Sequence, residues 1–138
     1  MVLKCASFDV KGREFMNKQE ILLLIDSMNI SKDDFVVLST SALVIRGIVD
    51  EARDLDIAVS KSGLQQLKKQ YKIIPKNEEW FVVSEKIECI VDDMVGKKEF
   101  FGGYYLQDIK NYLKYLKQSK KEKDKKRIPL VEAYIKGC

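Results

Sequence analysis

The sequence predicts one α+β domain: a mixed β-sheet of about four or five strands, with helices packed on one face and a C-terminal helical segment. Two observations support this fold class. A strand, a short helix and a second strand follow one another around Gly47, and residues from Glu79 to Val91 have the pattern of two further strands with a tight connection. The chain has 138 residues, of which 46% are hydrophobic and 33% charged, as expected for a single globular domain.

The first helix is predicted to begin after a segment without regular pattern. Residues 1–15 show no hydrophobic period, and we expect either a strand-like appendage or an extension from an upstream start. Asn17 is followed three residues later by Glu20, which is the pattern of a capping box. The apolar residues behind it recur at helical spacing and predict a helix that covers one face of the sheet. They are Ile21, Leu24, Ile25 and Met28.

A buried strand and a short helix are predicted next. Phe35 to Leu38 is an apolar run with the length and β-branched content of a buried strand, and we expect it to lie beside the strand formed by Arg53 to Val59. The hydroxyl residues Ser39 to Ser41 are expected to cap a helix over Ala42 to Arg46. Gly47 would end that helix, because glycine accepts the left-handed conformation common at a helix C-terminus.

The strand that ends at Val59 carries two acids. Alternation along a strand places Asp54, Asp56 and Ala58 on one face. The two carboxylates then stand about 7 Å apart and repel each other. A bound divalent cation is the simplest ligand that would offset this repulsion.

The remaining elements are predicted from shorter patterns. In chain order we expect a helix over Leu64–Tyr71 and strands over Lys72–Pro75, Glu79–Val83 and Lys86–Val91. Met94 to Gly103 is expected to be a loop whose aromatic residues close over the core, with a mobile lid as the alternative. Residues 104–138 are expected to be C-terminal helices, the first starting at Leu106 and the last with Pro129 in its first turn.

Composition excludes several kinds of site. Histidine is absent, so histidine-dependent triads and histidine metal ligands are ruled out. Cys5, Cys89 and Cys138 are far apart and are expected to be free thiols. No apolar run approaches the ~20 residues that span a membrane, and no basic segment precedes an apolar one near the start. We therefore expect no membrane contact, no signal peptide and a cytoplasmic location.

The basic excess lies near the C-terminus. The net charge is +4, and the segment from Lys117 to Arg127 holds seven basic and two acidic residues. Such a run usually forms a solvent-exposed helix face. Contact with a polyanion, either RNA or a nucleoside triphosphate, is the alternative.

From Phe35 to Ile135 the chain resembles the nucleotidyltransferases of the DNA polymerase beta-like superfamily, in particular small single-domain bacterial-type members, including those associated with toxin-antitoxin systems. Their signature is a strand, a small glycine-containing turn, a short helix and a strand with Asp-x-Asp. Here Leu38 to Leu43 takes the place of the turn and helix start, and Arg53 to Ile57 that of the acidic strand. Ser39 stands where the turn usually has its first glycine.

The resemblance implies an Mg²⁺-dependent transfer of a nucleoside monophosphate from a nucleoside triphosphate to an acceptor hydroxyl. Asp54, Asp56 and Glu88 would be the catalytic residues and the ligands of two Mg²⁺ ions, with Glu88 in place of the usual third aspartate. Asp92 or Asp93 could supply the third acid instead. The acceptor is unknown, whether a small molecule, a protein or tRNA.

The resemblance also implies a set of phosphate contacts. Lys121 to Asp124 looks like the family's basic-x-Lys-Asp element, and Arg46 is a further candidate for neutralising phosphate charge. The expected nucleotide-binding residues are Ser39, Thr40, Ser41, Arg53 and Lys123. Two alternatives stay open: a toxin-antitoxin component of the same superfamily, and a scaffold without catalysis that binds a nucleotide, RNA or a protein.

Overall fold

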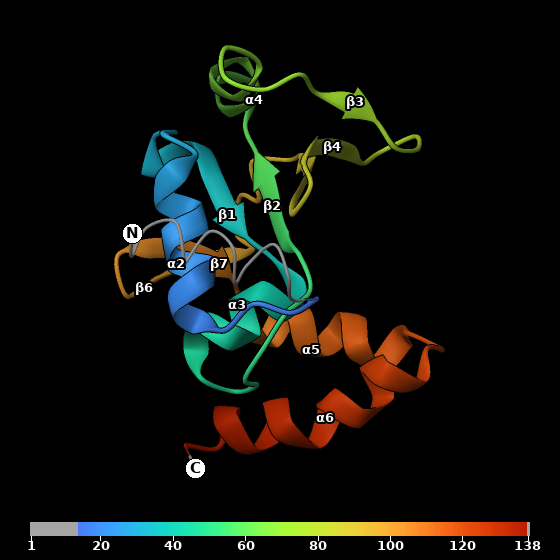
Figure 1. Cartoon of the computed structure of the whole chain (residues 1–138). Helices are drawn as coiled ribbons and strands as arrows, with labels where there is room; N and C mark the ends of the chain where they lie inside the picture. Colours follow the sequence, from blue (N-terminus) through green and yellow to red (C-terminus); the bar gives the residue numbers. More distant parts are fainter. Residues whose placement is uncertain (1–13, 138) are drawn as a thin grey trace.

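The computed structural model describes residues 14–137, which form an α+β fold around a seven-stranded mixed sheet (Figure 1). The elements in chain order are α2 (Lys18–Ser27), the short 3-10 helix η1 (Lys32–Asp34), β1 (Phe35–Val37), α3 (Ser39–Arg46), β2 (Leu55–Val59), α4 (Lys61–Lys68), β3 (Ile74–Pro75), β4 (Phe81–Ser84), β5 (Ile87–Val91), β6 (Lys98–Phe101), β7 (Tyr104–Gln107), α5 (Ile109–Gln118) and α6 (Glu122–Ile135). The strand order across the sheet is β3-β4-β5-β2-β1-β7-β6.

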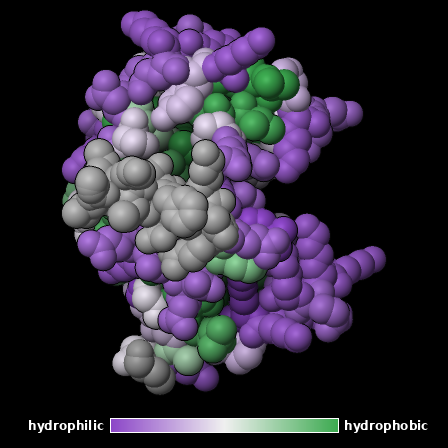
Figure 2. All heavy atoms as spheres, in the orientation of Figure 1, coloured by the Kyte–Doolittle hydropathy of each residue, from purple (hydrophilic) through white to green (hydrophobic). Residues whose placement is uncertain are grey.

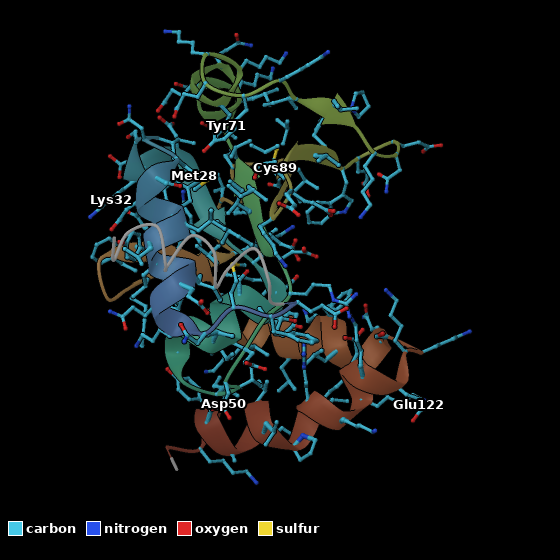
Figure 3. All side chains as sticks on the ribbon, viewed as in Figure 1. Met28, Lys32, Asp50, Tyr71, Cys89 and Glu122 are labelled. Carbon is cyan, nitrogen blue, oxygen red and sulfur yellow. The ribbon has the colours of Figure 1, made fainter. Side chains whose placement is uncertain are left out.

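The centre of the sheet brings the predicted strands together. β1 pairs antiparallel with β2, which confirms their predicted adjacency, and β2 pairs in parallel with β5. In that parallel register Asp56 lies beside Glu88 and Ile57 beside Cys89. Figure 3 shows Cys89 next to β2 accordingly. Antiparallel pairing of β4 with β5 confirms the predicted hairpin.

Different side chains and helices pack on the two faces of the sheet. Leu55, Ile57 and Val59 are fully buried in the main core, together with side chains of α2, α3 and α4. The opposite face carries Asp56 and Ala58, as the alternation predicts. There Ala58 belongs to a smaller apolar cluster. A third cluster joins α3 to the C-terminal helices, which lie below the sheet in Figure 1; it consists of Leu43, Ile109, Tyr112, Leu116 and Val131.

Local signals at two helix ends behave as predicted. The Asn17 side chain accepts the N–H of Glu20 at 2.9 Å, and the Glu20 side chain accepts the N–H of Asn17 at 2.9 Å, so the capping box is confirmed. Gly47 follows α3 with a φ of 81°, which is the left-handed conformation that favours glycine.

Two helix starts were predicted too late in the chain. α3 begins at Ser39 with Leu38 as its N-cap residue, so the hydroxyl residues form the first turn and do not cap it. α4 begins at Lys61, because the Ser60 hydroxyl caps it by accepting the N–H of Gly63 at 3.0 Å. Serine is a common cap as well as a common turn residue, and only the chain geometry separates these roles.

The C-terminal third departs most from the expectation. Met94 to Gly103 is not a loop closed over the core, because β6 and β7 form a hairpin whose turn uses positive φ angles at Gly102 and Gly103. Leu106 lies in β7, which pairs with β1, so residues 104–107 are strand and α5 starts at Ile109. The hairpin adds two strands and so raises the strand number above the predicted four or five, whereas β3 lies within the strand predicted over Lys72–Pro75.

Pro129 lies inside α6 and not in its first turn, which corrects the predicted start of the last helix. Proline removes one backbone hydrogen bond from a helix interior. Apolar residues on both sides of it, Ile128 and Val131, pack into the cluster shared with α5. We attribute the continuity of α6 to this packing.

Among residues 14–137, no helix is long and apolar enough to cross a membrane. Cys89 is a free, buried thiol, and burial raises its pKa to about 11. Cys5 and Cys138 lie outside the part of the chain that the structure describes. The expectation for residues 1–15 also falls almost entirely outside it.

Candidate functional site

Three acidic residues lie on, or immediately before, two neighbouring strands at the open face of the sheet. Asp56 in β2 and Glu88 in β5 are direct neighbours in the parallel register, and Asp54 immediately precedes β2. Asp92 and Asp93 follow the other end of β5, four and five residues beyond Glu88, so Glu88 is the acid beside the pair. We call Asp54, Asp56 and Glu88 the acidic cluster.

Like charges make the acidic cluster unfavourable for the folded state. Burial raises the pKa of Asp56 to about 6, and the charges of Asp54 and Glu88 act in the same direction. The pKa of Asp54 is also raised, first by burial and then by the charge of Glu88. Within residues 14–137, no hydrogen bond or ion pair engages the side-chain carboxylate of either aspartate.

Lys76 partly neutralises the cluster. Its Nζ lies 3.0 and 2.9 Å from the two carboxylate oxygens of Glu88. Its charge also lowers the pKa values of Asp54 and Asp56, against the effect of burial. Lys76 follows β3, a two-residue edge strand, and nothing in the sequence around it indicates a place in the site.

The turn between β1 and α3 keeps a backbone conformation that normally requires glycine. Ser39 has a φ of 54°, in the left-handed region that costs a non-glycine residue about 1 kcal/mol or more. Its N–H donates to Oε1 of Gln107 at 3.3 Å, and the Nε2 of Gln107 donates to Asn111 at 3.0 Å. Gln107, from β7, therefore holds the turn that begins α3.

Ser41 and Thr40 have different surroundings. Ser41 is fully buried, and its hydroxyl donates to the Leu38 carbonyl at 2.8 Å and accepts the N–H of Asp56 at 3.3 Å. Its hydroxyl thus ties α3 to β2 through these two hydrogen bonds. The hydroxyl of Thr40 accepts a hydrogen bond from Arg127 of α6. Arg127 brings a positive charge to the start of α3.

The three other basic residues considered for phosphate contact have different surroundings. Lys123, exposed in the first turn of α6, lowers the pKa of Asp56 slightly through its charge, but no hydrogen bond or ion pair among residues 14–137 joins it to the acidic cluster. Arg53 is 59% exposed and lies 3.5 Å from Glu14. Arg46 is only 3% exposed and forms an ion pair with Glu99 at 2.6 Å, so it is not available to a phosphate.

A cavity of about 430 Å³ adjoins the turn at Ser39. Its lining comes from the sheet face, the segments around β4 and β6, and α5. The lining residues are Leu38, Ser39, Trp80, Ile90, Met94, Lys97, Gln107, Asn111, Tyr112, Lys114, Tyr115 and Gln118. Figure 2 shows the molecular surface hollowed between the end that carries β3 and β4 and the end that carries α5 and α6.

The chemistry of the acidic cluster suits a hard cation. Carboxylate oxygens are the ligands that Mg²⁺ prefers, and this ion usually keeps several waters, so two carboxylates can be sufficient. Asp54 and Asp56 fit that requirement, whereas Glu88 is held by Lys76. In the part of the chain that the structure describes, no three acidic or cysteine side chains are close enough to form a complete metal site.

The structure thus brings together Asp54, Asp56 and Glu88, with the turn of Ser39 and Thr40 at the adjacent end of β1. Lys123 is near enough for its charge to lower the pKa of Asp56. Sequence reasoning missed Lys76, Arg127 and the cavity. Comparisons of the chain with protein-family models, with curated proteins and with solved structures found no match.

Proposed function

We propose that the protein is an Mg²⁺-dependent nucleotidyltransferase that moves a nucleoside monophosphate from a nucleoside triphosphate to an acceptor hydroxyl. One observation carries the proposal: three mutually repelling carboxylates stand on an open sheet face beside a left-handed turn that begins a helix. Such a cluster disfavours the folded apo protein, and a cation with a triphosphate would relieve it.

The chain's own residues then have separate roles. Asp54 and Asp56 would hold Mg²⁺, which would supply charge neutralisation to the triphosphate. The N–H groups at the start of α3 bind the terminal phosphates. Thr40 and the Arg127 guanidinium lie at this helix start, and Lys123 neutralises the leaving pyrophosphate. Glu88 accepts the proton of the acceptor hydroxyl, which requires the Lys76 ammonium to leave its carboxylate.

Nucleotide-dependent stabilisation tests the proposal. Each of the four Mg²⁺-nucleoside triphosphates is added, and at least one should raise the melting temperature, as any ligand of the native state must. The Asp54→Asn/Asp56→Asn variant should lose this response. Asp93→Asn is the matched control, because it removes an exposed aspartate that is near in sequence but lies beyond the far end of β5. A double variant that responds like the parent would contradict the proposal.

A scaffold without catalysis is the second candidate, and the Lys76–Glu88 ion pair favours it. An ammonium at 2.9 Å from the proposed proton acceptor occupies the carboxylate oxygens that the acceptor hydroxyl would have to reach. Incubation with α-labelled nucleoside triphosphates and cell extract separates the two candidates. Transfer of label supports the enzyme, whereas binding without any labelled product supports the scaffold. A labelled protein or tRNA would favour the toxin-antitoxin role, and a labelled small molecule would not.

The basic segment fits an RNA acceptor. Its lysines are exposed on the end of α5 and the first half of α6, near the start of α3 through Arg127. A polyanion bound there would lie beside Lys123 and the acidic cluster. The proposal places the protein in the cytoplasm, because a nucleotidyltransferase needs a supply of nucleoside triphosphate.

A further inference from the structure

Aromatic side chains line the cavity from two parts of the chain. Trp80, just before β4, belongs to the apolar cluster on the open sheet face. Tyr112 and Tyr115 of α5 stack with ring centroids 5.8 Å apart and ring planes 12° apart. Leu38 and Ile90 add aliphatic surface from β1 and β5. A volume of about 430 Å³ lies within the usual size of small-molecule sites. The cavity therefore has the lining of a site for a flat ring.

The charge of the cavity is opposite to that of the acidic cluster. None of its lining residues is acidic, while Lys97 and Lys114 contribute positive charge. Gln107 donates its amide N–H to Oδ1 of Asn111. The oxygen of Asn111 is therefore engaged, and its NH₂ group is left to donate to a ligand. The cavity thus offers donors and positive charge to a ring whose edge carries acceptor atoms.

Ser39 connects the cavity to the proposed phosphate site. It lines the cavity and is also the first residue of α3. Leu38, on the cavity wall, donates its N–H to the carbonyl of Asp56 at 2.8 Å. The cavity and the acidic cluster therefore adjoin the same pair of strands, β1 and β2. A ligand with its ring in the cavity would pass Ser39 to reach the start of α3 with its phosphates.

We propose that this cavity binds the base of the donor nucleoside triphosphate, stacked against Trp80 and the Tyr112–Tyr115 pair. The inference rests on the proposed function, because it names the part of the same substrate that the acidic cluster does not touch. It makes Tyr115, which is 48% exposed, an affinity-determining residue.

The chain contains one tryptophan, Trp80, which makes its fluorescence a direct probe of the cavity. The ligands are ATP, CTP, GTP and UTP with Mg²⁺, and inorganic tripolyphosphate with Mg²⁺ serves as the probe without a ring. We expect at least one nucleotide to change Trp80 fluorescence and tripolyphosphate not to do so. Tyr115→Ala should weaken binding of that nucleotide at least about fivefold, as expected for loss of base stacking. Phe100→Ala, which removes a 63% exposed ring outside the cavity, should have no effect.

The outcomes separate this inference from the proposed function. A melting temperature raised by nucleotide through Asp54 and Asp56, without a Trp80 response or a Tyr115→Ala effect, would overturn the base site and leave the transferase standing. A Trp80 response that persists unchanged in Asp54→Asn/Asp56→Asn would support ring binding and contradict the transferase. Free nucleosides that change Trp80 fluorescence equally with and without saturating Mg²⁺-triphosphate would assign the ring to the acceptor and overturn the donor assignment.

Discussion

Two groups of charged residues in this protein differ in how their charges are paired: the surroundings of Arg46 and the acidic cluster. Arg46 is buried, pairs with Glu99, donates to the Gln107 carbonyl at 3.2 Å and lies against the rings of Phe101 and Tyr134. The acidic cluster is partly open, joins like charges and has raised pKa values at both aspartates. The charge of Arg46 is paired within the fold, although its buried Nε has no hydrogen-bond partner among the described residues, whereas Asp54 and Asp56 have no ion pair there and only Glu88 is paired, with Lys76. Charge that is already compensated indicates structure, and uncompensated charge indicates a site.

The largest effect is expected from the compensated cluster. Arg46→Met should lower the free energy of unfolding by about 3 kcal/mol, because it removes a buried cation that links α3 to β6, β7 and α6. The cost stays at the lower end for a broken ion pair, because Glu99 is 40% exposed and keeps the N–H of Ile109. Urea denaturation followed by circular dichroism measures this change. Glu99→Gln keeps a hydrogen-bonding partner and should cost less. A stable Arg46→Met protein would make the two clusters equivalent.

The reverse is expected for the acidic cluster. Asp54→Asn/Asp56→Asn keeps the side-chain shape but removes two repelling charges, so the free energy of unfolding at pH 7 should rise by about 1–2 kcal/mol after solvent screening, most of it from Asp56. The same denaturation experiment measures it, together with the loss of nucleotide response. A loss of stability would mean that the aspartates hold the fold together, and the transferase proposal would lose its basis.

The pH dependence of the free energy of unfolding should show the effect of Asp56 alone. The pKa of Asp56 is about 6 in the folded protein against 3.8 for the free side chain, so between these values the folded state binds more protons than the unfolded state. Stability should therefore fall as pH rises from about 4 to 6, by about 1–2 kcal/mol after solvent screening. The difference between the pH profiles of the parent and of Asp56→Asn isolates this contribution. Parallel profiles would refute the raised pKa.

A smaller effect is expected at the turn next to the cluster. Ser39→Gly should raise the free energy of unfolding by about 0.5–1 kcal/mol, because glycine adopts a φ of 54° without strain. Ser39→Ala is the matched control: it keeps the Cβ and the strain, and should gain nothing. Thermal unfolding of the pair compares them. Equal stability of the two variants would show that the Gln107 contact, and not the backbone angle, determines this turn.

The central segment could be predicted because its signals are local. The capping box at Asn17, the helix end at Gly47 and the alternation around Asp56 each depend on residues close in sequence, and all three occur as predicted. The β6–β7 hairpin was missed because its four-residue strands have few alternating positions and Gly102-Gly103 is equally common in loops. Pro129 misplaced α6 because tertiary packing overrides a local helix breaker.

The candidate site divides in the same way. The Asp54 and Asp56 pair follows from strand alternation, and Glu88 could be named only through the family resemblance. Lys76 and Arg127 could not be found, because their partners lie 12 and 87 residues away and are set by strand pairing and helix packing. Arg46 was grouped with phosphate contacts because an arginine's charge is visible in a sequence, whereas its compensation by Glu99 is not.

The smallest effect on stability is expected from the exposed lysines of the C-terminal helices. Reversing Lys120, Lys121, Lys125 and Lys126 to glutamate should shift the melting temperature by only a few degrees, because all four are exposed. RNA affinity, measured by fluorescence anisotropy from about 50 to 200 mM salt, should fall and lose its salt dependence. The matched control reverses four exposed lysines around α4, which are Lys61, Lys68, Lys69 and Lys72. If both variants lose affinity equally, net charge and not the C-terminal surface attracts the polyanion. If neither does, the basic segment is only a solvated helix face, and the acceptor must be sought among ligands that carry no chain of phosphates.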